Sequence, residues 1–289
     1  MATSSVPQQV ANSERLFQSP SPLYSPTEDV EGNLYVVSTN GDIYQVQEGQ
    51  MDTAFPPGGQ PRGLVFDSQG SAFIADTAHQ AILSQTVTEN RGIEVTPVIK
   101  DFDGSALKGP NSIILSEKSN MLFFTDSGPL GETGLEDASG SLFGVDLSLS
   151  ILKPVVVNAL AYPFGLALSP EENVIYVAET NRNRVLRVVS HSSGVFHTSV
   201  FARFTGRFGP TALAMHASGL LYVARFDFTE CSDKGVISVV NENGEVESEL
   251  LLPGCPEITG LFFSRTQNDV LYVTESTTNS LIKILVGSS

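Results

Sequence analysis

The chain has 289 residues, of which 41% are hydrophobic and 17% charged, and its 32 acidic and 16 basic side chains give a net charge of −16. A field of this sign repels phosphate backbones and anionic lipid headgroups, so we expect neither nucleic acid nor membrane partners. A basic protein partner, a cation or a metal ion stays compatible, and so does a charge that only keeps a large β surface soluble. No stretch approaches the roughly 20 apolar residues of a membrane span.

The first twenty residues contain no apolar core of the kind found in a secretory signal, and they carry few arginines. A cytoplasmic location is therefore the default expectation. Residues 1–9 are short, polar and without a pattern, which predicts a flexible tail. Residues 10–289 are expected to form a single domain.

One short pattern, an apolar strand ending in a small or charged residue, returns six times in the chain. The copies are NLYVVST (33–39), SAFIADT (71–77), MLFFTDS (121–127), VIYVAET (174–180), LLYVARF (220–226) and VLYVTES (270–276). Their last polar residues are 38, 50, 53, 46 and 50 positions apart. A period of roughly 40–50 residues with β-branched and aromatic strands is typical of propeller blades. We predict an all-β, six-bladed β-propeller.

The ends of the chain predict how the ring closes. After the sixth copy there is room for only one more strand, Ser280 to Val286. The last blade would then lack its outermost strand and leave an open edge. The N-terminal segment Val10 to Phe17 is the expected donor of that strand.

Four segments, taken in order, carry a family resemblance. They are GPNSIILSEKSNMLFFTDS, YPFGLALSPEENVIYVAETNRNRVLRV, FGPTALAMHASGLLYVARF and PEITGLFFSRTQNDVLYVTES. Over residues 21–287 the chain resembles the superfamily of regucalcin, gluconolactonases, luciferin-regenerating enzyme and strictosidine-synthase-like proteins. The resemblance implies a six-bladed propeller whose lactonase members hold one divalent cation, calcium or zinc, at the top of the central channel.

The lactonase ligands implied by this resemblance are a Glu, two Asn and an Asp that open four of the blades. The matching positions here are Tyr24, Asn111, Phe164 and Thr211, so only Asn111 is retained. One Asn and one Thr would not compensate a divalent cation for the water ligands that it loses on binding. We therefore expect no cofactor, and calcium or zinc only if the chain is an enzyme. A shift of at least four residues would bring Glu28 or Asp29 to the first position.

The residues that open the blades predict a ligand site at the channel rim. They are Tyr24, Arg62, Asn111, Phe164, Thr211 and Thr259. This rim is more aromatic and less acidic than the resemblance implies for a lactonase, and it is similar to the strictosidine-synthase branch, for which the resemblance implies a metal-free apolar pocket and a catalytic glutamate. Glu257 and Glu275 lie near the expected top face, but neither sits in a matching sequence. The catalytic residues therefore stay unassigned.

A second ring consists of the residues that end the six repeated strands: Ser38, Asp76, Asp126, Glu179, Arg225 and Glu275. Its carboxylates could bind a polar ligand, or they could cap backbone N–H groups of neighbouring turns. Arg225 is either a local ion-pair partner or a hook for an anion, and we count it among the candidate ligand-binding residues.

Two insertions lead towards the top face. Gly128 to Gly140 could be a lid, a docking surface or a disordered segment. Phe226 to Gly235 contains Cys231, and Cys255 precedes the next blade. We expect the Cα atoms of the two cysteines within about 7 Å, the limit for bridging, while the bond itself stays open.

Two classes of function remain. The first is a non-catalytic or catalytically degenerate propeller, a scaffold that binds a protein partner, a larger assembly or a small ligand across its top face. The second is an enzyme that uses the channel pocket, either a lactone or ester hydrolase with metal-activated water or a strictosidine-synthase-like enzyme.

Overall fold

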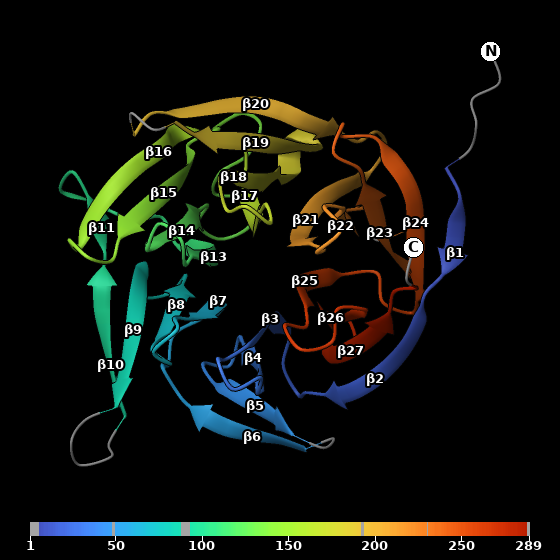
Figure 1. Cartoon of the computed structure of the whole chain (residues 1–289), viewed down its shortest axis with the longest axis horizontal. Helices are drawn as coiled ribbons and strands as arrows, with labels where there is room; N and C mark the ends of the chain where they lie inside the picture. Colours follow the sequence, from blue (N-terminus) through green and yellow to red (C-terminus); the bar gives the residue numbers. More distant parts are fainter. Residues whose placement is uncertain (1–5, 48–49, 88–92, 192–193, 230, 288–289) are drawn as a thin grey trace.

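The computed structural model describes residues 6–47, 50–87, 93–191, 194–229 and 231–287. In these residues six sheets, each with four antiparallel strands, stand around a central channel, which confirms the six-bladed β-propeller (Figure 1). The only helical element in the described ranges is the short 3-10 turn Thr180–Arg182. None of the described helices is long and apolar enough to cross a membrane.

The blades follow one another along the chain, each running from the channel outwards. Blade 1 consists of β3 (Leu23–Glu28), β4 (Leu34–Ser38), β5 (Ile43–Gln47) and β6 (Gln50–Phe55). Blade 2 consists of β7 (Pro61–Phe66), β8 (Ala72–Asp76), β9 (Ala81–Val87) and β10 (Ile93–Ile99). Blade 3 consists of β13 (Pro110–Ser116), β14 (Met121–Asp126), β15 (Gly140–Asp146) and β16 (Ile151–Leu160). A small hairpin, β11 (Asp101–Phe102) and β12 (Ser105–Ala106), precedes blade 3.

The second half of the ring repeats this order. Blade 4 consists of β17 (Pro163–Leu168), β18 (Val174–Glu179), β19 (Arg184–Ser190) and β20 (Phe196–Arg203). Blade 5 consists of β21 (Phe208–Met215), β22 (Leu221–Asp227), β23 (Lys234–Val240) and β24 (Val246–Pro253). Blade 6 consists of β25 (Ile258–Phe263), β26 (Val270–Glu275), β27 (Ser280–Leu285) and the N-terminal β2 (Asn12–Gln18).

The N-terminal segment closes the ring, as predicted. Strand β2 pairs antiparallel with β27 from Asn12 opposite Leu285 to Gln18 opposite Ser280. The predicted strand began too early, because Val10 ends a separate strand, β1 (Gln8–Val10), that pairs parallel with β24 of blade 5. Gln8 and Gln9, expected in a flexible tail, therefore belong to a sheet, and residues 1–5 lie outside the described residues.

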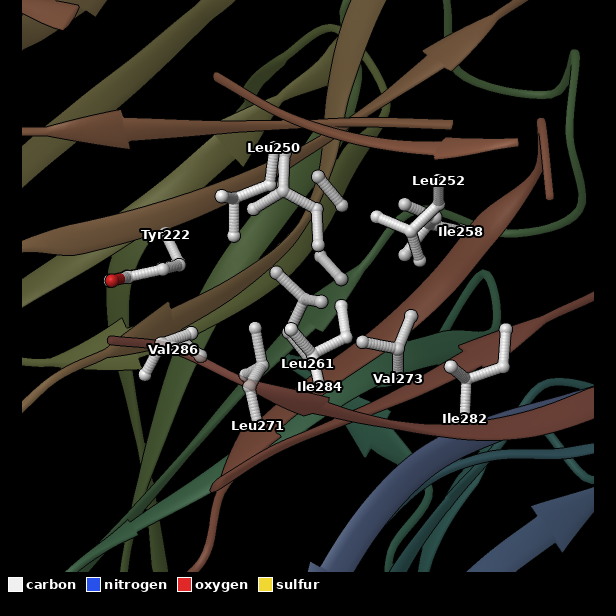
Figure 2. Close-up of a cluster of buried hydrophobic side chains, with 14 of the residues drawn as sticks. Tyr222, Leu250, Leu252, Ile258, Leu261, Leu271, Val273, Ile282, Ile284 and Val286 are labelled. Atoms are coloured by element: carbon white, nitrogen blue, oxygen red, sulfur yellow. The ribbon is translucent and has the colours of Figure 1, made fainter. Parts of the chain in front are cut away.

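The hydrophobic core lies between the faces of neighbouring blades. Strands β14, β18 and β26 are buried along their whole length, because a neighbouring blade packs against each of their two faces. Figure 2 shows one such layer, in which Leu250 and Leu252 of blade 5 pack with Ile258, Leu271 and other side chains of blade 6. Each fully buried aliphatic side chain contributes about 1.5–3 kcal/mol, so these layers supply much of the stability.

The innermost strands β3, β7, β13, β17, β21 and β25 surround the channel (Figure 1). Each of them changes register with its neighbour within its first few residues, the mark of a β-bulge that re-aims a side chain. The inner strands also approach one another closely. A Cβ on Gly165 would lie 2.3 Å from the carbonyl oxygen of Thr211, so this position of blade 4 admits only glycine.

Candidate ligand site at the channel mouth

A cavity of 260 Å³ lies in the channel between the inner strands. At the end where the inner strands begin, which we call the mouth, it is lined by Arg62, Asn111, Phe164 and Thr259. Further along, its walls are mainly apolar side chains such as Ile113, Leu166, Leu213, Met215 and Phe263. Arg265 lines the cavity at the opposite end, beyond the end of β25, so the cavity has a polar group at each end and a mainly apolar interior. Apolar walls with a few polar groups are the usual form of a small-molecule site.

The structure separates the seven predicted site residues. Arg62, Asn111, Phe164 and Thr259 line the cavity. Tyr24 lies beside them, because the Arg62 guanidinium stands 4.3 Å from the centre of its ring. Thr211 is 3% exposed, and its hydroxyl donates to the carbonyl oxygen of Ile258 at 3.1 Å. Its role is therefore to join blades 5 and 6.

Arg62 is the charged group of the mouth. It is half-buried, and its guanidinium stacks on Tyr24 in a cation–π contact. In the described parts of the chain its side chain has neither an ion pair nor a hydrogen bond. A guanidinium carries five N–H donors, so Arg62 presents unused hydrogen-bonding capacity and an uncompensated positive charge to the mouth.

Tyr162 does not line the cavity but lies beside the mouth, next to Asn111 and Phe164, and it was not found from the sequence. It is 6% exposed, and its backbone has a φ of 54°, an unfavourable conformation for a bulky residue. Burial raises the pKa of Tyr162 to about 12, with smaller effects from Arg62, Tyr24 and a hydrogen bond to Asn111. The only sequence signal for Tyr162 was its position directly before Pro163 and Phe164. Residues with a strained backbone, such as a positive φ, are frequent at ligand sites.

The residues at the family's metal-ligand positions do not fit a divalent cation. Phe164 has no donor atom, the Thr211 hydroxyl is engaged by backbone, and Tyr24 lies under the positively charged Arg62. The Nδ2 of the remaining position, Asn111, donates to the hydroxyl of Ser127 at 3.2 Å. Across the described ranges no group of three or more His, Cys, Asp or Glu side chains could hold a metal.

A shift of register does not restore the site. Glu28 ends β3 at the opposite end from Tyr24 and accepts hydrogen bonds from the Ser264 hydroxyl and the Arg265 N–H, both at 2.8 Å. Asp29 accepts from the backbone N–H of Glu31 and of Asn33, both at 2.9 Å, and holds a turn. Both carboxylates therefore have structural partners away from the mouth.

The carboxylates of the strand-end ring cap backbone groups, as the second of our two interpretations stated. Asp126 accepts from the N–H of Lys108 at 3.0 Å and of Gly109 at 2.8 Å. Burial raises the pKa of Asp126 and these hydrogen bonds oppose the rise. Because Lys108 and Gly109 precede β13, the carboxylate fixes the entry of its own blade.

The same arrangement recurs in blades 2, 4 and 6. Asp76 accepts from the N–H of Gln60, and Glu179 accepts from the N–H of Ala161 and forms ion pairs with Arg182 and Arg184. Glu275 accepts from the N–H groups of Glu257, Thr277 and Thr278 at 3.2, 2.8 and 2.7 Å. The other candidate glutamate, Glu257, accepts from the Ser276 hydroxyl at 2.7 Å.

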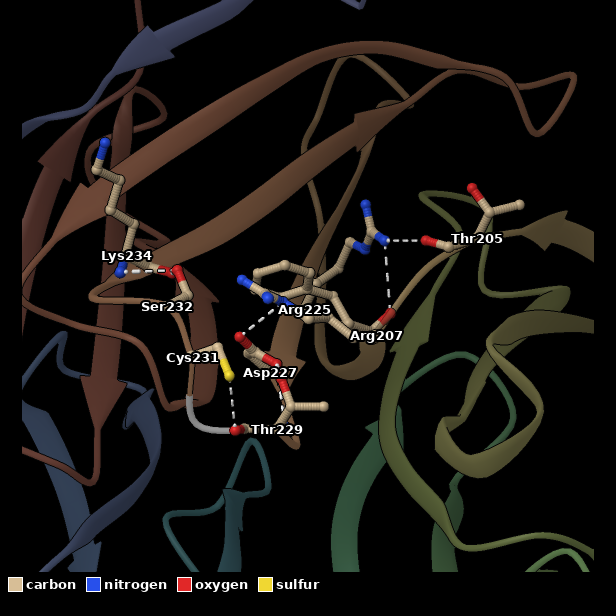
Figure 3. A network of polar contacts seen from close by, with 9 residues as sticks. Thr205, Arg207, Arg225, Asp227, Thr229, Cys231, Ser232 and Lys234 are labelled. Carbon is tan, nitrogen blue, oxygen red and sulfur yellow. Dashed lines mark hydrogen bonds and ion pairs between the residues drawn. The ribbon is translucent and has the colours of Figure 1, made fainter.

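Arg225 is a local ion-pair partner and does not line the channel. Its guanidinium donates to the carbonyl oxygen of Thr205 at 3.1 Å, as Figure 3 shows. It also donates to the carbonyl oxygen of Phe208 at 3.4 Å. It also lies 3.2 Å from the Glu249 carboxylate. Its charge is paired with Glu249 and it lies outside the cavity, so we no longer count it among the ligand-binding candidates.

The two cysteines are free thiols, Cys231 exposed and Cys255 buried. The Cys231 Sγ lies 3.2 Å from the carbonyl oxygen of Thr229, within the same loop (Figure 3). No disulfide therefore joins the insertion to blade 6 in this structure. The separation of the two Cα atoms stays a prediction.

Comparisons with known proteins agree with this architecture. The family described as the SMP-30/Gluconolactonase/LRE-like region matches residues 22–277. Lactonase drp35 of Staphylococcus epidermidis is 26% identical over 233 residues, which are 78% of this chain and 67% of that protein. The adipocyte plasma membrane-associated protein Hemomucin of Drosophila melanogaster is 29% identical over 138 residues, 45% of this chain and 24% of that protein.

Solved structures show the same fold. The calcium-binding protein regucalcin of Agrobacterium tumefaciens superimposes with a TM-score of 0.78 at 16% identity, covering 98% of this chain and 97% of its own. A gluconolactonase of Xanthomonas campestris gives a TM-score of 0.77 at 18% identity, covering 96% and 90%. Identities this low establish the fold alone, and the match of the family profile establishes descent. The chain belongs to the SMP-30/gluconolactonase/LRE-like family.

Proposed function

We propose that this chain is a non-catalytic binding propeller whose channel takes a small organic anion without a metal ion. The anionic group, a carboxylate or a sulfonate, lies against Arg62 at the mouth, and an apolar body enters the channel. The observation that carries the proposal is the Arg62 guanidinium, which lies at the cavity on the Tyr24 ring without an ionic partner among the described residues.

The charge of the protein makes this arrangement informative. A net charge of −16 repels an anion at long range, so a bound anion needs a strong local contact. A guanidinium provides one, since it donates two parallel hydrogen bonds to a carboxylate. Asn111 adds a neutral polar group to the lining, and Tyr162, whose pKa burial raises to about 12, lies beside it as a neutral phenol.

The size of the cavity limits the ligand. Its 260 Å³ lies just below the range of about 300–1,000 Å³ found for small-molecule sites, so the ligand is small. The interior walls carry aliphatic and aromatic side chains such as Leu166, Met215 and Phe263. They favour an aromatic or aliphatic body over a sugar, because apolar walls cannot satisfy several hydroxyl groups.

Two fluorescent probes of nearly equal shape test the proposal. One is 8-anilinonaphthalene-1-sulfonate, which is anionic, and the other is N-phenyl-1-naphthylamine, which is neutral. We expect Arg62→Met to lower the affinity for the anionic probe about tenfold, which is the effect of losing one charge-assisted contact. The affinity for the neutral probe should change by no more than about twofold. Arg203→Met is the matched control, because Arg203 is exposed on the outer strand β20 and its loss changes net charge equally.

Equal weakening by Arg62→Met and Arg203→Met would contradict the proposal, because the probe would then sense only the overall field. Equal weakening of both probes by Arg62→Met would also contradict it, because the residue would then act through the shape of the cavity. Binding is measured with chelator present throughout.

A second candidate is lactone hydrolysis, and one observation favours it. The relatives named lactonase drp35 match this chain over as much as 78% of its length. The residues at the mouth argue against lactone hydrolysis, because they do not supply the ligand atoms that the metal ion would need. Turnover of six-membered aliphatic and aromatic lactones that depends on added calcium and is lost in chelator would establish hydrolysis and displace the binding proposal.

A further inference from the structure

A second hollow lies on the same face as the channel mouth. It is a groove of 530 Å³ between the insertion Gly128 to Gly140 of blade 3 and the loops of blades 4 and 5. Its walls include Glu132, Leu135, Asn181 and Phe228, and it shares no lining residue with the channel cavity. We call it the insertion groove.

The insertion that forms one wall is held in a defined shape. Thr133 is fully buried, and its hydroxyl donates to the carbonyl oxygen of Ser127 at 2.8 Å. The N–H of Gly128 donates to the backbone carbonyl oxygen of Gly109 at 3.0 Å, and the N–H of Gly134 donates to the backbone carbonyl oxygen of Asp137 at 2.9 Å. Of the three roles considered for the insertion, these contacts exclude the disordered segment, and the groove is preformed for binding.

Large apolar side chains are exposed in and beside the groove. Leu135 is 66% exposed and Phe228 is 38% exposed on its walls. Leu130, in the same insertion, is 63% exposed. Phe228 also stacks on Phe226, with ring centres 4.5 Å apart, which holds its ring in place. Such a group of exposed apolar side chains with polar neighbours is typical of a surface that contacts another protein.

The charge of the groove is negative and unpaired. Three carboxylates of the insertion, Glu132, Glu136 and Asp137, line it, and in the described part of the chain their side chains have no ion pair or hydrogen bond. The single cation of the groove, Arg207, is engaged by Asp227 at 3.0 Å. The groove therefore attracts positive charge and repels an anion.

We propose that the insertion groove docks a basic segment of a protein partner, in which lysines or arginines alternate with leucine or aromatic side chains. The three carboxylates select the positive charges, while Leu135 and Phe228 receive the apolar side chains. A bare cation would use the carboxylates but leave the apolar residues in water. An anion such as the channel ligand is excluded by charge, so the two sites take different molecules.

The test uses a fluorescein-labelled peptide of nine residues in which lysine and leucine alternate, and fluorescence anisotropy with the full chain. We expect the triple variant Glu132→Gln, Glu136→Gln, Asp137→Asn to bind at least about tenfold more weakly at low salt. The control triple Glu117→Gln, Glu171→Gln, Glu242→Gln removes the same charge from exposed turns on the opposite face, and we expect it to stay within about twofold.

A further variant separates docking from general attraction between charges. Leu135→Ser keeps every charge, and Leu135 is exposed, so folding is unaffected; we expect it to weaken the peptide several-fold. Arg62→Met should leave the peptide affinity unchanged. The proposal is overturned if the wild-type chain does not bind the peptide at low salt, if both triple variants lose the same affinity, or if Leu135→Ser has no effect.

Discussion

The propeller carries two rings of polar residues on one face, and they differ in what their side chains have left to offer. In the strand-end ring Asp76, Asp126, Glu179 and Glu275 are at most 4% exposed and accept backbone N–H groups of their own blades. The ring at the channel mouth, which we call the mouth ring, contains no carboxylate, and its Arg62 has no hydrogen bond among the described residues; its members are Tyr24, Arg62, Asn111, Phe164, Thr211 and Thr259. The strand-end ring carries more charge, but its charged groups are used to hold the structure. The mouth ring carries less charge, but it has the free hydrogen-bond donors that a ligand site needs.

The comparison predicts opposite consequences of mutation. Substitutions in the strand-end ring should lower stability without a specific effect on ligand, since buried donors lose their acceptors. Substitutions of the cavity-lining side chains in the mouth ring should change binding with little effect on stability.

The largest loss is expected for Glu275→Ala. It removes three hydrogen bonds that the carboxylate accepts, from the N–H groups of Glu257, Thr277 and Thr278, and a hydrogen bond to a charged group contributes about 1.5 kcal/mol or more. We expect a loss of about 4 kcal/mol, measured by urea denaturation. Glu257→Ala, which removes only a contact with the Ser276 side chain, is the matched control and should cost about 1 kcal/mol. Equal losses would show that the strand-end position has no special role.

A close second is Gly165→Ala, which tests the packing that positions the mouth. The new Cβ would lie 2.3 Å from Thr211 backbone, and overpacking of this kind costs about 3 kcal/mol. Gly134→Ala is the control, because its Cβ would meet only Asn181 at an ordinary 3.6 Å. Thermal unfolding of both variants checks the difference, and a Gly165→Ala chain as stable as Gly134→Ala would disprove the close approach of blades 4 and 5.

A smaller effect appears only in alkali and concerns Tyr162. Burial raises its pKa from 10.0 to about 12, so the unfolded chain loses this proton before the folded chain does. Stability is unaffected below pH 10 and falls as pH rises from 10 to 12. At pH 11 the raised pKa of Tyr162 lowers the free energy of unfolding by about 1.4 kcal/mol relative to its value below pH 10. Urea denaturation should show that the free energy of unfolding falls less between pH 8 and pH 11 for Tyr162→Phe than for the wild type. Equal falls in the two proteins would show that the Tyr162 hydroxyl is exposed to water.

The smallest change in stability is expected for Arg62→Met. Its guanidinium contributes one cation–π contact, worth about 1 kcal/mol or less at a half-exposed site, and methionine retains some contact with Tyr24. The same variant should lose most of its affinity for the anionic probe, so stability and binding separate. A loss of stability like that of Glu275→Ala would instead make Arg62 a structural residue.

The fold was predictable because the blades repeat and the ends of the chain imply a missing strand. The N-terminal closure followed from counting strands, although β1 on blade 5 did not, since the three residues Gln-Gln-Val are too few to show a strand pattern. The capping role of the strand-end acids was one of two interpretations, and only the hydrogen-bond partners decided between them. Tyr162 was missed because its position depends on backbone strain, and the pairing of Arg225 was missed because its partner Glu249 lies on another strand of the blade; no local pattern reveals either.

The most direct test of the central claim is anomalous diffraction from crystals grown with 4-bromobenzoate and manganese, which stands in for calcium. The account predicts a bromine peak inside the channel, with the carboxylate on Arg62 beside Asn111 and Tyr162, and no manganese peak at the mouth. A manganese peak coordinated by Asn111, with no bromine in the channel, would contradict it and return the mouth to the metal-binding role of the family.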